Sequence, residues 1–94
     1  MQYYKRIIFP PRGLPQITYY RVQEQAMRID MVRMDSAGTK ILPYPDRPEQ
    51  YDSRGTFNFR LGKLKEQASK VPASIAEPIF ADYDKVRNGG ISVG

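Results

Sequence analysis

Proline bounds or interrupts most segments of this chain. Because proline fixes φ and has no amide hydrogen to donate, it is excluded from central strands and from helix interiors beyond the first turn. Average usage of about 5% would give roughly five prolines in 94 residues, whereas the chain has eight. They occupy positions 10, 11, 15, 43, 45, 48, 72 and 78. The pattern predicts short elements and stiff connections within a single domain of residues 1–94.

The segments on either side of the first three prolines have the composition of strands. Residues 3–9 and 17–22 are rich in aromatic and β-branched residues, so we predict two strands that pair across the proline loop. Each segment contains two adjacent tyrosines: Tyr3 and Tyr4 in the first, Tyr19 and Tyr20 in the second. Successive side chains of a strand point to opposite faces, so we expect one tyrosine of each pair to point outward.

The next segment admits two readings. As a strand, it places Met27, Ile29 and Met31 on one face. As a helix over residues 21–34, it would carry apolar residues on two opposite sides, which argues for the strand and leaves the helix as the alternative. Residues 35–38, Asp-Ser-Ala-Gly, have turn composition. We therefore predict a hairpin with strands near 27–34 and 39–44, followed by an irregular loop through residue 53.

The stretch from Arg54 to Lys65 interleaves basic and aromatic residues and contains no acid. Phe57, Phe59 and Leu61 alternate with polar residues, which predicts a half-buried strand near 56–61. Strands that bind RNA use alternating aromatics after a basic residue and glycine. Here the aromatics come one residue late and would face the other way, so the simpler interpretation places them in the core.

The C-terminal third has helical periodicity. We predict helices over 63–71 and 75–87, the second opened by a capping box of Ser74 and Glu77 and ended at Gly89-Gly90. Residues 91–93 have the composition of a short edge strand. The fold class is therefore α+β: a small antiparallel sheet with strands near 3–9, 17–22, 27–34, 39–44 and 56–61, and two short C-terminal helices.

The residue types present argue against catalysis. The chain has neither cysteine nor histidine, which excludes disulfides, cysteine-ligated zinc and the commonest acid–base group. It also lacks the Gly-x-Ser-x-Gly and Ser-x-x-Lys patterns of serine nucleophiles. Asp46, Glu49 and Asp52 recur every third residue, but proline and arginine between them favour solvated loop charges over a Mg²⁺ or Ca²⁺ site. We expect a protein that is not an enzyme and uses no cofactor.

The charge distribution indicates a binding protein. The net charge is +5, and residues 1–22 and 54–65 each carry four basic residues and no acid. Two functions fit: a protein-binding or assembly module within a complex or homo-oligomer, and, as the alternative, a nucleic-acid-binding protein. For either partner, the candidate contact residues are basic or aromatic: Tyr4, Lys5, Arg6, Tyr20, Arg21, Arg54, Arg60, Lys63 and Lys65.

The sequence also bears on location. No apolar run approaches the roughly 18 residues of a membrane span, and the N-terminus lacks the layout of a signal peptide. We therefore expect no membrane insertion, and a protein that is cytoplasmic or associated with a virion or another complex.

Overall fold

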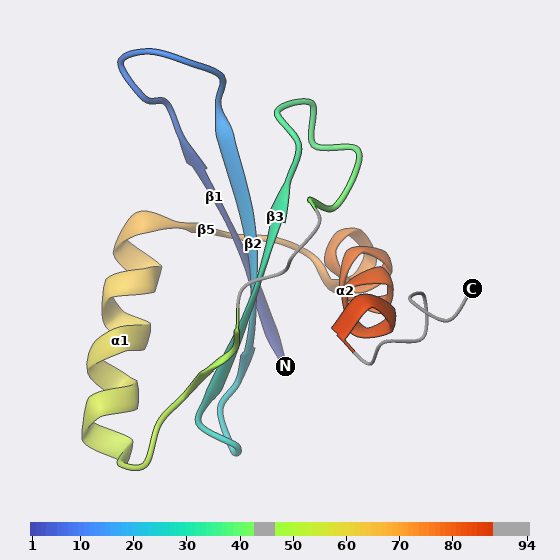
Figure 1. Ribbon diagram of the computed structural model, residues 1–94. Helices are drawn as coiled ribbons and strands as arrows, with labels where there is room; N and C mark the ends of the chain where they lie inside the picture. Colours follow the sequence, from blue (N-terminus) through green and yellow to red (C-terminus); the bar gives the residue numbers. More distant parts are fainter. Residues whose placement is uncertain (43–46, 88–94) are drawn as a thin grey trace.

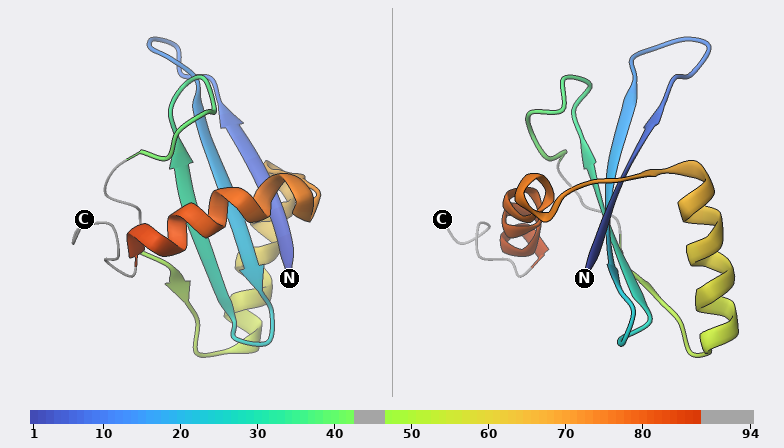
Figure 2. Two further views of the ribbon diagram at one scale, coloured as in Figure 1. Left: turned by 90° about the vertical axis from the view of Figure 1, so that its right-hand side faces the viewer. Right: turned by 180° about the vertical axis from the view of Figure 1, so that it is seen from behind.

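A five-stranded antiparallel sheet forms the centre of the protein, with one helix on each face (Figures 1 and 2). The computed structural model describes residues 1–42 and 47–87. In chain order the elements are β1 (Gln2–Ile8), β2 (Gln16–Gln23), β3 (Arg28–Met34), β4 (Glu49–Gln50), α1 (Arg54–Gln67), β5 (Ser69–Lys70) and α2 (Ala73–Arg87). The strand order across the sheet is β4-β3-β2-β1-β5. The α+β class predicted from the sequence is confirmed.

Two long antiparallel hairpins, β1–β2 and β2–β3, make up most of the sheet. β1 pairs with β2 across the proline loop, as predicted, and the register places Tyr4 opposite Tyr20. β2 pairs with β3 so that Arg21 lies opposite Asp30, which confirms the strand interpretation of this segment over the helical one. The chain reverses between them at Met27, whose φ of 51° lies in the left-handed region.

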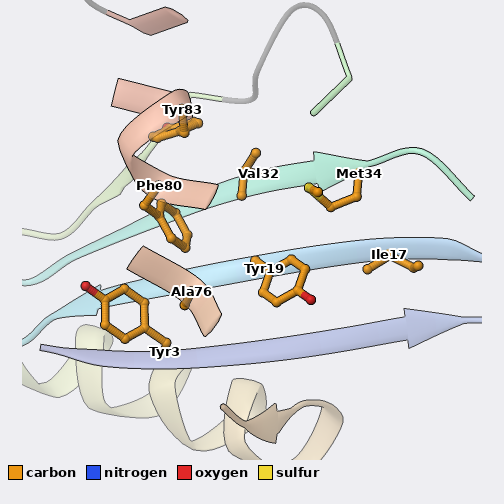
Figure 3. Close-up of a cluster of buried hydrophobic side chains, with 8 residues drawn as sticks. All are labelled: Tyr3, Ile17, Tyr19, Val32, Met34, Ala76, Phe80 and Tyr83. Atoms are coloured by element: carbon orange, nitrogen blue, oxygen red, sulfur yellow. The ribbon is translucent and has the colours of Figure 1, made fainter. Parts of the chain in front are cut away.

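Each helix covers one face of the sheet and creates one of two hydrophobic cores. On one face, Phe57, Leu61 and Leu64 of α1 pack on strand residues that include Tyr4 and Tyr20. On the other, the core around α2 comprises Tyr3, Ile17, Tyr19, Val32, Met34, Ala76, Phe80 and Tyr83 (Figure 3).

The adjacent tyrosines of β1 and β2 are all buried, because both faces are covered. Tyr3 and Tyr19 lie under α2, whereas Tyr4 and Tyr20 lie under α1. The alternation is as expected, but the expectation that one tyrosine of each pair points outward is wrong. Their exposed fractions are only 5–8%.

The predicted strand near 56–61 is instead the first half of α1. Ser53 caps this helix, since its hydroxyl oxygen accepts a hydrogen bond from the Thr56 amide at 3.2 Å. Phe57 and Leu61 are buried at i and i+4, whereas Phe59 between them is 70% exposed. A helix thus buries Phe57 and exposes Phe59, which a strand would have placed on the same face. The predicted helix over 63–71 accordingly begins earlier, at Arg54, and ends at Gln67.

The predicted strand near 39–44 is reduced to an isolated bridge between Ile41 and Met34. A tight turn comes between them, in which the Asp35 amide donates to the Lys40 carbonyl at 2.8 Å. Gly38 sits in this turn with a φ of +73°. Residues 39 and 40, the start of the predicted strand, belong to this turn instead. Residues 43 and 44 lie outside those described.

The second C-terminal helix is confirmed, with a different start. α2 begins at Ala73, and the Pro72 carbonyl accepts hydrogen bonds from the amides of Ile75 and Ala76. Ser74 therefore lies within the first turn, and the predicted capping box is wrong. The predicted helix end at Gly89-Gly90 and the edge strand at 91–93 lie outside the described residues. Among the helices of the described chain, none is long and apolar enough to cross a membrane.

Candidate protein-interaction site

One end of the sheet projects beyond both helices. It consists of the β1–β2 loop (residues 9–15), the strand ends that flank it and the turn at residues 35–42 (Figure 1, upper end; Figure 2). We call this region the distal end. On its α2 side the turn covers the sheet, because the Cα of Gly38 lies so near Ile17 that an added Cβ would be 3.4 Å from the Ile17 Cδ1. The α1 side has no such cover in the described chain.

A groove of about 650 Å³ occupies this open side of the distal end. Its floor comes from strand side chains of the α1 face, beginning where Tyr20 enters the α1 core. The strand pairing places Arg6, Thr18 and Arg33 side by side in one row across β1, β2 and β3. Apolar residues from strands and loops also line the groove: Ile8, Leu14, Pro15, Met31 and Leu42, together with Ile17 and Met34, which belong to the α2 core as well. The polar residues Gln16, Asp35 and Ser36 complete the lining. The groove thus combines apolar side chains with a pair of arginines.

The distal end carries a strong excess of positive charge. Residues 5–16 and 33–42 hold five basic side chains and one acid, Asp35. The Asp35 carboxylate already accepts hydrogen bonds from the Thr39 amide at 2.8 Å and the Thr39 hydroxyl at 3.0 Å. The backbone hydrogen bond from Thr39 is the main reason that the pKa of Asp35 lies below its usual value. No carboxylate of residues 1–42 and 47–87 forms an ion pair with Arg6.

Exposed apolar side chains gather at the same end. Seven large hydrophobic residues of the described chain are exposed, and four of them lie here: Ile7, Phe9, Leu14 and Leu42. Phe9 and Leu14 are 75% and 70% exposed, respectively. Scattered exposed apolar residues are common on protein surfaces, but a gathering beside a groove is typical of an interaction site.

The structure distributes the nine predicted contact residues over different surroundings. Arg6 and Tyr20 line the groove, although Tyr20 is only 5% exposed. Tyr4 is equally buried beneath α1. Lys5 lies on the opposite face from Arg6, with its Nζ 5.6 Å from the centre of the Tyr19 ring. The strand alternation that separates Lys5 from Arg6 therefore divides the N-terminal basic segment between two faces.

Arg21 is part of the interior and not of a contact surface. Its Nε donates to the Asp30 carboxylate at 2.9 Å, and its two terminal nitrogens donate to Asp84. Asp30 is fully buried and also accepts from Gln23 and Arg28. The predicted role of Arg21 in partner binding has no support from this arrangement, because its donors are already used within the fold.

The basic residues of α1 also differ in their surroundings. Arg60 donates to Glu49 at 2.8 and 3.2 Å, which fixes the helix to β4. Arg54 donates to the backbone carbonyl of Glu24 at 3.0 Å. Lys63 and Lys65 are exposed, and the Lys63 ammonium lies 5.6 Å from the centre of the Phe59 ring. None of these four residues lines the groove.

Sequence reasoning missed Arg33 and the apolar loop residues of the groove. A signal for the latter was present, because Phe9 and Leu14 flank a Pro-Pro-Arg-Gly segment that cannot bury them in a regular element. A second basic hollow was also missed, lined by Arg28, Arg47 and Arg87 with Pro48 and Gln50. These three arginines are far apart in the sequence, and no local pattern connects them.

Among the acids of the 43–53 segment, Glu49 is bound to other side chains of the fold. The Glu49 carboxylate accepts hydrogen bonds from Arg60 and from the Tyr51 hydroxyl. Burial raises the pKa of Glu49, but these hydrogen bonds outweigh it and hold the pKa below its usual value. Within residues 1–42 and 47–87, no three acidic side chains are grouped to hold a metal ion. Asp46 lies outside the described residues.

Comparisons of the chain with models of protein families, with curated proteins and with solved structures found no significant match.

Proposed function

We propose that this protein is a non-enzymatic protein-binding module, a small subunit or accessory protein of a larger complex, and that it binds its partner with the distal end. The observation that carries the proposal is the coincidence of three features at this end. These are the groove, the four exposed apolar side chains and the excess of basic residues. Protein interfaces combine an apolar centre with a polar rim in this way, and arginine is enriched in them.

The helices cover both faces of the sheet, so the distal end is the part of the sheet that a partner can reach. The tyrosines of β1 and β2 are used in the two cores, so they offer a partner little surface. Elsewhere on the described surface, the exposed large hydrophobic residues lie singly: Met1, Phe59 and Ile75. The groove therefore remains the surface on which a partner would bury most apolar area, and apolar burial dominates most protein associations.

A photo-crosslinking amino acid at position 14 tests the proposal in the organism that makes the protein. Leu14 is 70% exposed at the rim of the groove, and Phe59, equally exposed on α1, is the matched control. We expect a defined crosslinked protein from position 14 and not from position 59. We also expect Leu42→Glu to abolish that crosslink. Equal crosslinking from both positions, or none from position 14, would contradict the proposal.

Nucleic-acid binding is the second candidate, favoured by the basic distal end and by the hollow of Arg28, Arg47 and Arg87. Because each phosphate contact releases counterions, such binding should weaken steeply with salt. A titration with single- and double-stranded oligonucleotides at two salt concentrations tests it. Micromolar binding that falls with salt and with Arg6→Glu would favour nucleic acid, and no binding at low salt would exclude it.

A further inference from the structure

The outer edge of β1 is only partly paired. β5 is the last strand of the sheet on this side, and it pairs only with Tyr4 and Lys5 of β1. No strand of the described residues pairs with this edge from Arg6 to Ile8. In Figure 1, β5 crosses beside the middle of β1 and then leaves toward α2, so the upper part of β1 has no neighbour on its outer side.

The direction of the free backbone groups follows from the pairing with β5. The Tyr3 carbonyl accepts a hydrogen bond from the Val71 amide at 3.0 Å, so the backbone groups of Tyr3 face outward. In an antiparallel strand the N–H and C=O of every second residue point to the same side. Ile7 therefore presents its N–H and C=O to the outside, beyond the end of β5. Unpaired backbone groups at a strand edge are a template for another strand.

The side chains at this edge define what such a strand would meet. On the α2 side the edge presents Ile7, which is 43% exposed and precedes the exposed Phe9 by two residues. On the α1 side it presents Arg6 and Ile8, both of which line the groove. A strand added to β1 would thus meet apolar residues on one face and a guanidinium on the other. Cross-strand neighbours of opposite charge stabilise a pair of strands, as do apolar pairs.

We propose that β1 receives an extended segment of a partner protein as an additional strand, continuing the line of β5, and that this segment alternates apolar and acidic residues. Its apolar side chains pack on Ile7 and Phe9, and an acidic side chain pairs with Arg6. The proposal rests on the proposed function and adds the mode of binding and the partner's chemistry.

The charge of the edge selects this occupant over a second copy of the chain. An antiparallel edge-to-edge dimer centred on the unpaired Ile7 would place Arg6 of one copy diagonally across from Arg6 of the other, within reach of these long side chains, and like charges across strands are destabilising. An acidic segment meets no such repulsion, because the only acid of residues 5–16 and 33–42 is Asp35, which is bound by Thr39.

A capped hexapeptide of alternating valine and glutamate is a direct probe. Amide NMR spectra of the ¹⁵N-labelled protein should shift at residues 6–9 on titration, and the Ile7 amide should exchange more slowly with solvent. A peptide with lysine in place of glutamate should give no saturable shift. Arg6→Gln should weaken binding by up to about five-fold, which corresponds to the ~1 kcal/mol of one cross-strand charge pair.

Two modifications, one in the peptide and one in the protein, distinguish strand addition from electrostatic attraction alone. A peptide N-methylated at alternate residues loses the donors that β1 needs and should not bind. Ile7→Pro removes the outward N–H while leaving the hydrogen bonds to β2, since proline is tolerated on edges, and should also abolish binding. Near-ultraviolet circular dichroism shows whether this variant is folded, and the N-methylated peptide decides the matter if it is not.

The outcomes distinguish this inference from the proposed function. If both methylated and unmethylated peptides bind equally, or neither binds while position 14 still crosslinks to a partner, strand addition is overturned and the interaction site stands. If neither peptide binds and no crosslink forms, both are overturned. A dimer in light scattering that Ile7→Pro dissociates would assign the edge to a second copy and overturn the acidic partner.

Discussion

Arg21 and Asp84 form a bidentate ion pair, with nitrogen–oxygen distances of 3.0 and 2.9 Å, that joins the centre of the sheet to α2. The Arg21 guanidinium also lies 4.8 Å from the centre of the Phe80 ring and binds the buried Asp30. Burial lowers the pKa of Arg21, but the hydrogen bonds to Asp84 and Asp30 outweigh it and raise the pKa above its usual value. A residue that the sequence marked as a surface cation is therefore a connection between layers.

Replacing Arg21 by methionine should destabilise the protein by about 3 kcal/mol, since loss of one partner from a buried ion pair typically costs about 3–5 kcal/mol. The cost should fall near the lower limit, because Asp30 keeps its hydrogen bonds from Gln23 and Arg28. Urea unfolding measures it. Arg12→Met, at an exposed loop position, is the control and should change stability by less than about 0.5 kcal/mol. Equal stability of the two variants would refute the structural role of Arg21.

The same ion pair should make stability depend on pH in the acid range. Hydrogen bonds from Arg21 hold the pKa of Asp84 below its usual value of 3.8. A lowered folded-state pKa means that the contribution of Asp84 is fully present above the unfolded-state pKa and is lost as pH falls through the folded-state pKa. Wild type should therefore exceed Asp84→Asn in stability at about pH 6, and the difference should shrink below about pH 4.

Urea unfolding of both proteins across this pH range measures the difference. Asp82→Asn, an exposed position on the same helix, is the matched control. A difference between wild type and Asp84→Asn that stays constant down to about pH 2 would contradict the linkage.

Phe57 and Phe59 should respond very differently to truncation, because the helix buries one and exposes the other. Phe57 is fully buried in the α1 core, whereas Phe59 is 70% exposed. Phe57→Ala should cost about 3–5 kcal/mol, as is typical of a large aromatic removed from a core. Phe59→Ala should cost less than about 0.5 kcal/mol. Thermal or urea unfolding compares them, and similar costs would indicate the strand that the alternating pattern suggested.

This pair of phenylalanines also shows how far the sequence could predict the fold. Phe57, Phe59 and Leu61 satisfy a period of two, while Phe57, Leu61 and Leu64 satisfy the helical period, and a short segment does not decide between them. β1 and β2 were predictable because prolines limit them and their β-branched and aromatic residues favour strands. Alternation in Tyr19 and Tyr20 predicts which faces they occupy, but only the packing of α1 and α2 determines that both faces are covered.

The candidate site was predictable only in part, for a related reason. Arg6 was identified from the basic N-terminal segment and does line the groove. Arg21 lies in a similar run of aromatic and β-branched residues, but its partner Asp84 lies 63 positions away in the sequence. Arg33 and Leu42 reach the groove through the pairing of β2 with β3 and the turn that follows. Contacts between distant segments decide which basic side chains are bound within the fold, as Arg21 is. A local sequence pattern carries no information about such contacts.

Two glycines should respond in opposite ways to alanine substitution. Gly38 has a φ of +73°, a conformation that costs an L-residue about 1–2 kcal/mol. Gly62 lies within α1, and a Cβ there would meet nothing within 4 Å, so alanine should stabilise the helix by about 0.5–1 kcal/mol. Urea unfolding should therefore show a lower midpoint for Gly38→Ala and a higher one for Gly62→Ala. A stabilising Gly38→Ala would mean that the turn covering Ile17 adopts another conformation in solution, and the shape of the distal end would have to be revised.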